Sequence, residues 1–541
     1  MTRKLPKYLD PEKWIGRFRQ ERDGLRTRYL RSKVEALFTE LRTSTFGGDG
    51  PQAIVVDGMW ENPNYWLRLR LFLGALPEIH TCRLIGVLRS REDKSQRRML
   101  ESLGISEIVY LQDHEQSAAD YVPEATALLD GVQSHADLLQ LDLPGGLPTY
   151  IYYDTVLKLT RDPQPPLDNP MWKKSLAETL RNIAFFENLF SVNDVIRVIV
   201  SHPWKSEYAS LCWAGASRGV PSYHLTAYTD GIRIRRFTSP DDFSKPIEHL
   251  PVTELTCLPE TAITQFASLG EAYLADRANG VGTDINVRYA FNPDGRPEGR
   301  SEARRFLGVG DETPIVAIYS HAWYDFPHTF GMDNFTDYLD WMRFTIEHIR
   351  NRPDVIWLLK PHPAEPWYGG FQLRDVADDL PAHIRYCDTA TDSLAILSAV
   401  DAVVTMHGTV GIEAAALGLP VISVDRSYYS DWGFTHLALS REHYVTLLDE
   451  AHRLPPPSKE KQRDAAIFSY FAQAPHPKGL GLLNMACDSL GWQLYADLLD
   501  RFKRDDPTLE AEQRAISAWV DSDIPCYSVY QKLSYYRNFS A

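Results

Sequence analysis

The hydrophobic pattern changes its period several times along the chain, and each change predicts a new element. Ala53 to Val56 is an apolar run of strand length, Tyr65 to Leu76 repeats its apolar residues at helical spacing, and Leu84 to Leu88 is a second short apolar run. Strand, helix and strand in this order form the unit of a parallel sheet covered by helices. The first part of the chain is therefore predicted to build a parallel α/β sheet.

The same sheet is predicted to continue for more than a hundred residues. Ile108 to Leu111 predicts a third strand, and Val122 to Leu189 has mainly the pattern of helix and loop. Val195 to Val200 is rich in β-branched residues, which favour strands, and Val220 to Leu225 predicts the next strand.

The second half of the chain repeats this architecture more cleanly. Between Asn279 and Arg300 the chain is rich in Gly, Pro, Asn and Asp, which is typical of a linker. Beyond it, short apolar runs alternate with helix-period segments, which predicts a doubly wound sheet. The predicted strands are Ile315 to Tyr319, Val355 to Leu359, Ile384 to Tyr386, Ala402 to Thr405 and Val421 to Val424, and the predicted helices are Asn334 to Arg350, Thr391 to Val400 and Thr409 to Leu417.

The length agrees with two cores. The chain has 541 residues, of which 44% are hydrophobic, and single cores stop growing near ~300 residues. We predict an α/β protein with two Rossmann-like doubly wound domains that face a cleft, over residues 51–295 and 296–450. A basic helical segment over residues 1–50 precedes them, and a helical segment over residues 451–541 follows as an outer layer that can return to the first domain.

Charge and cysteine usage restrict the class of protein. The net charge of -15 argues against a protein that coats nucleic acid, because that task needs clustered Lys and Arg. The 6 cysteines lie far apart without a C-x-x-C pair, which favours a reducing cytoplasm and indicates no metal site. We expect neither a signal peptide nor a membrane span, since no run of about 18 apolar residues occurs.

The start of the chain departs from this acidic average. Through Arg42 it carries twelve Lys or Arg against six Asp or Glu, and apolar residues such as Trp14, Phe18 and Leu25 recur at roughly helical spacing. A basic amphipathic helix can lie on anionic lipid, whereas a helix packed on its own domain is the more common arrangement. Peripheral contact with the inner face of the membrane is thus one of two interpretations.

Residues of unusual chemistry follow three predicted strands of the second domain. Ser320-His321 follows the first strand, Lys360-Pro361-His362-Pro363 follows the second, and Met406-His407-Gly408-Thr409 links a later strand to a helix that contains Glu413. The carboxyl ends of strands in a doubly wound sheet share one rim, where ligands bind. We therefore predict a nucleotide-binding set of Ser320, His321, Lys360, His362, Pro363, His407, Gly408, Thr409 and Glu413.

The residue types suit a phosphorylated ligand. Two prolines fix the loop that holds His362, whose ring can donate to an anionic oxygen, and Lys360 adds positive charge. Gly408 allows close approach of the backbone, and Thr409 can cap a helix whose first N–H groups attract phosphate. Glu413, one turn along, can accept from ribose hydroxyls; the alternative is a capped buried helix with an exposed Glu413.

The runs LLKPHPAE and VVTMHGTVGIEAAALGLPVISVD resemble the nucleotide-binding half of capsule polysaccharide biosynthesis proteins, which include Kdo transferases of the GT-B type. They are more loosely similar to HP-motif bacterial sialyltransferases, teichoic acid glycerophosphotransferases and non-hydrolysing UDP-sugar 2-epimerases. The resemblance implies a metal-independent GT-B enzyme in which His362 and Thr409 contact the donor phosphate and Glu413 is the helix glutamate. It also implies an acid or base before a glycine in the first domain, which Asp230 in Thr229-Asp230-Gly231 matches in part.

Sugar transfer needs a group that takes the proton of the acceptor hydroxyl. Strand ends of the first domain that should face the cleft offer Asp230, Asp57, Glu61 and His202 as catalytic candidates, although each also suits a turn or a cap. Strand alternation would place Arg233 and Arg235 on one face. They could bind an anionic substrate, or simply charge an exposed edge strand.

Together these features predict a cytoplasmic glycosyltransferase of surface polysaccharide (capsule or lipopolysaccharide) biosynthesis. The leading donor is CMP-Kdo or a similar acidic nucleotide sugar, the acceptor a saccharide or lipid-linked saccharide, and no cofactor or metal is expected. The alternatives are a polyol-phosphate transferase of the CDP-glycerol type, for which His362 and His407 would be paired, a UDP-sugar 2-epimerase, and a non-catalytic nucleotide-sugar sensor.

Overall fold

The computed structural model describes residues 46–227, 231–252, 258–281, 285–476 and 506–539, with isolated positions between 28 and 36 and between 496 and 504. The predicted basic helix before residue 46 lies almost entirely outside the described residues, as does the stretch from 477 to 505 in the C-terminal helical segment. Asp230 also lies outside them.

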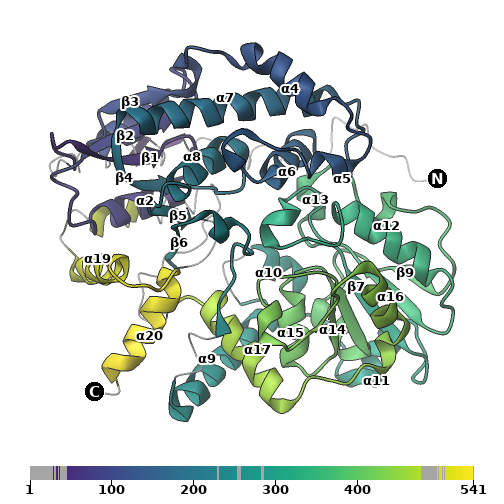
Figure 1. Ribbon diagram of the computed structural model, residues 1–541. Helices are drawn as coiled ribbons and strands as arrows, with labels where there is room; N and C mark the ends of the chain where they lie inside the picture. Colours follow the sequence, from purple (N-terminus) through teal and green to yellow (C-terminus); the bar gives the residue numbers. More distant parts are fainter. Residues whose placement is uncertain are drawn as a thin grey trace, which may run out of the picture.

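The first lobe is built on a six-stranded sheet in the order β3-β2-β1-β4-β5-β6, seen at the upper left of Figure 1. Neighbouring strands are parallel except β5 and β6, which are antiparallel. From β1 to β3 the chain adds strands toward one edge of the sheet, and from β4 on it adds them toward the other edge. The order reverses between β1 and β4, as in doubly wound nucleotide-binding sheets. The strands are β1 (Gln52–Asp57), β2 (Arg83–Leu88), β3 (Glu107–Tyr110), β4 (Asp194–Val200), β5 (Ser222–Thr226) and β6 (Arg233–Phe237).

The second lobe repeats this order around its own first strand. Its sheet runs β12-β11-β10-β7-β8-β9 and is parallel throughout, with the reversal point between β7 and β10. Two such lobes define an α/β fold of the GT-B type, which confirms the predicted fold class. The strands are β7 (Ile315–Tyr319), β8 (Ile356–Lys360), β9 (Ile384–Tyr386), β10 (Ala402–Thr405), β11 (Val421–Ser423) and β12 (His436–Leu437).

Helices connect and cover both sheets, and the sequence marks several of their starts. Asn62 and Asn169 each precede a proline at the first helical position, and each side chain accepts a backbone N–H two residues on, at 2.8 and 3.0 Å. The helices of the first lobe are α2 (Pro63–Leu73), α3 (Lys94–Ser102), α4 (Val122–Leu129), α5 (His135–Leu138), α6 (Thr149–Thr160), α7 (Pro170–Val192) and α8 (Ser206–Ala216). Those that follow are α9 (Glu260–Ala278), α10 (Ile285–Ala290), α11 (Gly299–Phe306), α12 (Tyr338–Ile349), α13 (Glu365–Tyr368), α14 (Ser393–Ala399), α15 (Val410–Ala416), α16 (Arg441–Asp449), α17 (Lys459–Ala472), α19 (Pro507–Val520) and α20 (Tyr527–Phe539).

Helix α9 lies before the boundary predicted at residue 295, yet it packs on the second lobe. Its Phe266 shares a hydrophobic cluster with Ile315 of β7 and Phe468 of α17. A Cβ atom on Gly270 would lie 1.8 Å from the Ala466 carbonyl oxygen, so the close approach of α9 to α17 requires glycine. The apolar face of α9 therefore assigns it to the second lobe, which corrects the predicted division there.

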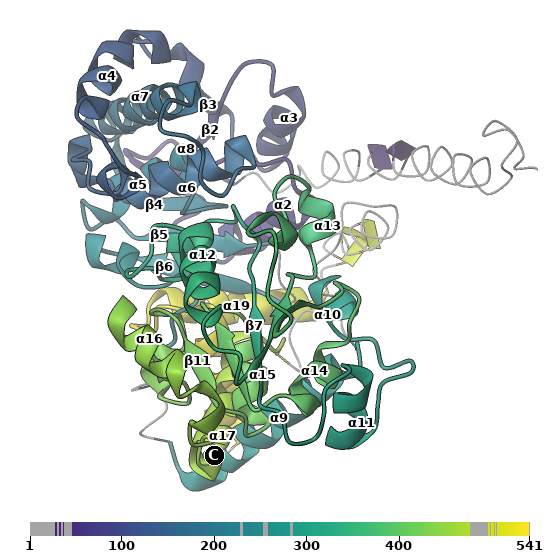
Figure 2. The same cartoon turned by 90° about the vertical axis from the view of Figure 1, so that its right-hand side faces the viewer.

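The two C-terminal helices divide between the lobes: α19 packs on the first and α20 mainly on the second. Ile516 and Trp519 of α19 are buried in one cluster with Val56 of β1 and Tyr223 of β5, whereas Val529 and Leu533 of α20 are buried with residues of α17. Figure 1 shows both helices in yellow, with α20 running from the first lobe toward α9 and α17. Figure 2 shows the two lobes one above the other. Helix α20 contacts both β6 of the first lobe and α17 of the second.

Candidate functional site

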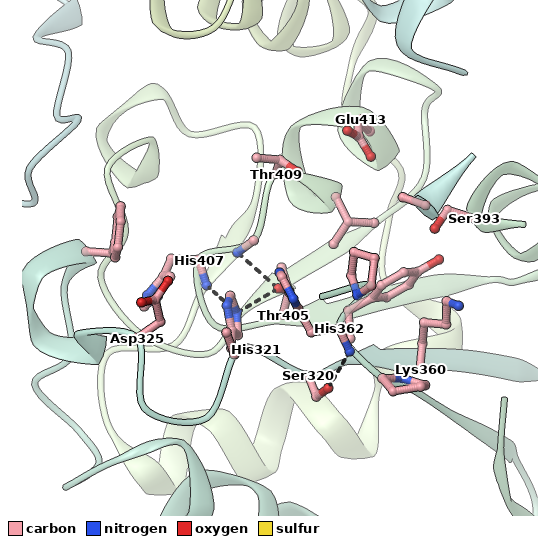
Figure 3. A pocket seen from close by; sticks show the side chains of 18 of the residues that line it. Ser320, His321, Asp325, Lys360, His362, Ser393, Thr405, His407, Thr409 and Glu413 are labelled. Carbon is pink, nitrogen blue, oxygen red and sulfur yellow. Dashed lines mark hydrogen bonds between the residues drawn. The ribbon is translucent and has the colours of Figure 1, made fainter. Parts of the chain in front are cut away.

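A cavity of 290 Å³ opens at the reversal point of the second sheet. Here the chain passes from β7 to β8 toward one edge of the sheet and from β10 to β11 toward the other. It is lined from the carboxyl ends of β7, β8 and β10 (Figure 3). The structure brings together all of the residues that were predicted to bind nucleotide: Ser320, His321, Lys360, His362, Pro363, His407, Gly408, Thr409 and Glu413. Their individual contacts differ from what the sequence suggested.

His362 is fixed by the backbone around it. Its N–H donates to Ser320 Oγ at 3.1 Å, and its Nδ1 accepts the N–H of Ala364 at 3.2 Å. Burial lowers the pKa of His362 to about 4, so the ring is neutral at pH 7. Because Nδ1 accepts, the single ring proton belongs to Nε2, which is left as a donor for a ligand.

Thr409 starts α15 without capping it, which corrects one prediction. Its side chain makes no cap hydrogen bond and is exposed at the cavity wall. Thr405 Oγ1 instead accepts the N–H of Gly408 at 3.1 Å. A Cβ atom on Gly408 would lie 2.8 Å from that oxygen, so the glycine serves the close approach of the loop to Thr405.

The two other histidines line the cavity but make their hydrogen bonds to protein groups, and their role as nucleotide ligands stays a prediction. His407 Nδ1 bonds to the Gly331 carbonyl at 3.2 Å, and its Nε2 bonds to the Tyr338 hydroxyl at 2.5 Å. His321 stacks on Tyr338, and its Nε2 accepts the N–H of His407 at 3.4 Å. Burial lowers the pKa of His407 to about 3 and that of His321 as well. Both rings thus support the loop that carries Thr409.

Lys360 is likewise tied to backbone. Its Nζ donates to the carbonyl oxygens of Asp388 and Thr389, at 3.0 and 2.7 Å. Burial lowers the pKa of Lys360 to about 8. The ammonium group therefore holds the loop after β9 against the cavity, and a ligand would share it with two carbonyl groups.

Glu413 is buried, so the alternative of an exposed side chain is wrong. Nε and Nη2 of Arg277, on α9, both donate to its Oε1 at 3.1 and 2.9 Å. Arg277 also lines the cavity but was missed in the sequence. The two residues are 136 positions apart, and no local pattern links them.

Asp325 is a second cavity residue that sequence reasoning missed. Its carboxylate lies 2.6 Å from Nζ of Lys158, on α6 of the first lobe, and accepts the Tyr368 hydroxyl at 3.0 Å. Figure 3 shows Asp325 on one side of the pocket and Ser393 on the opposite side. Asp325 thus joins the cavity to the first lobe, and its position in the irregular loop after β7 gives no sequence signal.

The described catalytic candidates of the first lobe do not line this cavity. Asp57 is fully buried, and its carboxylate accepts from Met59 N and from the N–H and hydroxyl of Ser201. Burial raises the pKa of Asp57 to about 6, against the effect of these bonds. Asp57 therefore joins the ends of β1 and β4, which corrects its predicted catalytic role. Glu61 is exposed beside the start of α2.

His202 occupies an aromatic niche of the first lobe. Its Nδ1 bonds to Ser201 Oγ at 3.0 Å, and its ring meets Trp60 edge to face at 4.2 Å between centroids. Burial lowers the pKa of His202 to about 3, with Lys205 and Lys158 acting in the same direction and Glu207 and Asp325 opposing them. His202 therefore lies within electrostatic reach of the Lys158–Asp325 pair.

Arg233 and Arg235 are alternate residues of β6, and both line a small pocket of 50 Å³ beside that strand. Arg235 is 7% exposed and donates to the carbonyl oxygens of Pro246 and Ile247. Arg233 donates to the Gln473 carbonyl. Arg235 thus holds the loop after β6 and Arg233 the end of α17, because buried carbonyls need donors. Neither residue lines the main cavity, and their role in substrate binding stays a prediction.

Two kinds of feature are absent from the described residues. In that part of the chain no group of His, Cys, Asp and Glu side chains is arranged to hold a metal ion. Likewise, none of the helices described is both long and apolar enough to cross a membrane.

Comparisons with known proteins identify similar solved structures. No protein-family model matches the chain, and no curated protein sequence does. A β-Kdo 2,4 transferase, KpsC of Thermosulfurimonas dismutans, matches 51% of this chain and 79% of its own at 13% identity and a TM-score of 0.33. The UDP-GlcNAc 2-epimerase of Neisseria meningitidis, bound to UDP-GlcNAc, matches 83% and 100% at 10% identity and a TM-score of 0.25. Spinosyn rhamnosyltransferase SpnG matches 84% and 99% at 11% identity and a TM-score of 0.25.

Proposed function

We propose that the chain is a glycosyltransferase that binds a nucleotide-activated sugar in the 290 Å³ cavity. The observation that carries the proposal is that His362 and Thr409 line one cavity at the reversal point of a doubly wound sheet. The Nε2–H group of a neutral His362 and the Thr409 hydroxyl supply donors for a phosphate group. Glu413, in the same cavity, supplies a carboxylate for ribose hydroxyls.

The transfer also needs a proton acceptor, and Asp325 is our candidate. Its carboxylate is part of the cavity lining, and Lys158 and Tyr368 hold it in position. In the proposed reaction Asp325 takes the proton of the acceptor hydroxyl as the new glycosidic bond forms. The bond between the sugar and the phosphate oxygen breaks, and the leaving nucleotide keeps the electron pair while His362 donates to its phosphate.

The leading donor is CMP-Kdo or a similar acidic sugar, and the acceptor a saccharide of capsule or lipopolysaccharide biosynthesis. The support is the resemblance of the loops around His362 and Thr409 to those of Kdo transferases. A CDP-glycerol type transferase would use His362 and His407 as a pair, and the bonds of His407 to Gly331 and Tyr338 speak against that alternative. A UDP-sugar 2-epimerase would use the same fold.

Thermal unfolding with CMP, CDP and UDP separates these alternatives, because a ligand stabilises the state that it binds. At a concentration of 100 Kd the expected stabilisation is about 2.7 kcal/mol. Preference for CMP supports the Kdo-like donor, preference for CDP the polyol phosphate, and preference for UDP a hexosyltransferase or an epimerase. No stabilisation by any of the three would contradict the proposed function.

A further inference from the structure

The cavity has a second end, remote from Asp325, where a buried ion pair forms part of the wall. Figure 3 shows Glu413 and Ser393 on this side, with Thr409 between Glu413 and the histidines. Arg277 reaches Glu413 from α9, and both side chains belong to the cavity lining. Since the phosphate donors His362 and Thr409 lie between the two ends, this end is the place for the nucleoside.

The ion pair between Arg277 and Glu413 uses only one of the two carboxylate oxygens. Arg277 Nε and Nη2 both donate to Oε1 of Glu413, at 3.1 and 2.9 Å, so the pair makes no use of Oε2. The side chains are 8% and 9% exposed, which means that little water screens the interaction. Arg277 also donates from Nη1 to the Tyr273 hydroxyl at 3.4 Å, and its guanidinium lies 5.7 Å from the centroid of that ring. The guanidinium plane is therefore fixed on α9.

Because the Arg277 guanidinium is held in place, it also holds the Glu413 carboxylate in one orientation. A buried carboxylate is costly unless it is paired, and pairing at a single oxygen also selects the rotation of the carboxyl group. The second oxygen is then available at one defined position in the cavity wall. A carboxylate oxygen accepts hydrogen bonds only, so its partner must be a donor such as the hydroxyls of a ribose 2′,3′-diol.

We infer that Arg277 is a positioning residue that orients Glu413 toward the ribose, and that it thereby selects ribonucleotides over 2′-deoxyribonucleotides. This inference rests on the proposed function, because it assumes that a nucleotide occupies the cavity. The other role of the pair would be purely structural, as a tie between α9 and α15. A purely structural tie affects the free energy of unfolding but has no reason to affect the ratio of two ligand affinities.

The test is calorimetric titration of the full chain with CMP, UDP and their 2′-deoxy forms. The wild type should bind the ribonucleotide at least about tenfold more tightly, as expected for a hydrogen bond to a charged group. Arg277→Lys keeps the positive charge but not the two N–H bonds that converge on Oε1. This substitution should reduce the ratio of the ribonucleotide affinity to the deoxyribonucleotide affinity to below about threefold, mainly by weakening the binding of the ribonucleotide.

Two further variants make the result decisive. Glu413→Gln should also lose the preference for ribose, because it removes the negative charge that the diol contacts. This variant replaces Arg277→Lys in the test if Arg277→Lys fails to fold. Arg352→Lys is the matched control, since Arg352 makes paired bonds to Asp354 away from the cavity. A wild type that binds ribo and deoxy forms equally, or an Arg277→Lys variant with an unchanged ratio, would overturn the inference while leaving the proposed function intact. If no nucleotide binds the wild type, the proposed function itself fails, and this inference fails with it.

Discussion

The Nδ1 atom of His328 lies 2.7 Å from one carboxylate oxygen of Asp154, and the N–H of His328 donates to the other at 3.1 Å. His328 belongs to the short helix η7 (Pro327–Phe330) of the second lobe, and Asp154 to α6 of the first. Burial opposes a charged ring, but the Asp154 carboxylate outweighs it and raises the pKa of His328. The two lobes are thus joined by a buried contact between a histidine and a carboxyl group near the cavity.

We predict that this contact makes stability depend on pH. A histidine whose pKa is raised by folding contributes stability fully below its unfolded pKa of about 6.5, and loses it as pH rises through the folded value. Thermal unfolding should therefore show a larger difference between wild type and His328→Phe near about pH 6 than near about pH 9. His348→Phe, which removes a surface pair with Asp449, is the control. A difference that does not change with pH would contradict the role given to His328.

Tyr338→Phe tests the structural role of His407. The substitution removes the hydroxyl that bonds to His407 Nε2 at 2.5 Å and leaves a buried ring nitrogen unpaired. We expect a loss of about 1–3 kcal/mol in the free energy of unfolding, measured with urea, and an unchanged affinity for nucleotides. Intact stability combined with weakened nucleotide binding would instead return His407 to the ligand set.

Asp325→Asn tests the proposed proton acceptor. Once a donor is identified, kcat should fall by about 10²- to 10⁴-fold, because the amide cannot take the proton, while the affinity for the nucleotide stays close to that of the wild type. Asp333→Asn is a matched control, since Asp333 pairs with Arg426 at the surface. A kcat equal to that of the wild type would remove Asp325 from the reaction.

The hydrophobic pattern of the sequence predicted the strands and the fold class of this structure well. Apolar runs such as Ile315 to Tyr319 form strands because burial on both faces of a parallel sheet demands continuous hydrophobicity. The location of the site followed from the same pattern, since the residues after β7, β8 and β10 must meet at one rim. Strand order and polarity therefore gave the position of His362 and Thr409.

The direction of side chains and the partners from distant segments were not predictable in this way. His407 follows a strand as His362 follows its own, yet its ring bonds to Tyr338 of helix α12 and to Gly331 in a loop, both about 70 residues away in the sequence. Arg277 reaches the cavity only because α9 packs on α17. Such contacts depend on tertiary packing, which neither periodicity nor local motifs contain.

The most direct test of the central claim is the affinity of CMP, CDP and UDP for the wild type and for His362→Ala, measured by calorimetry beside the parent nucleosides. If His362 Nε2 donates to the phosphate, His362→Ala should weaken nucleotide binding by at least about tenfold and leave nucleoside binding unchanged. Equal affinity of both proteins for the nucleotides, or no binding to the wild type, would contradict a phosphate site in this cavity.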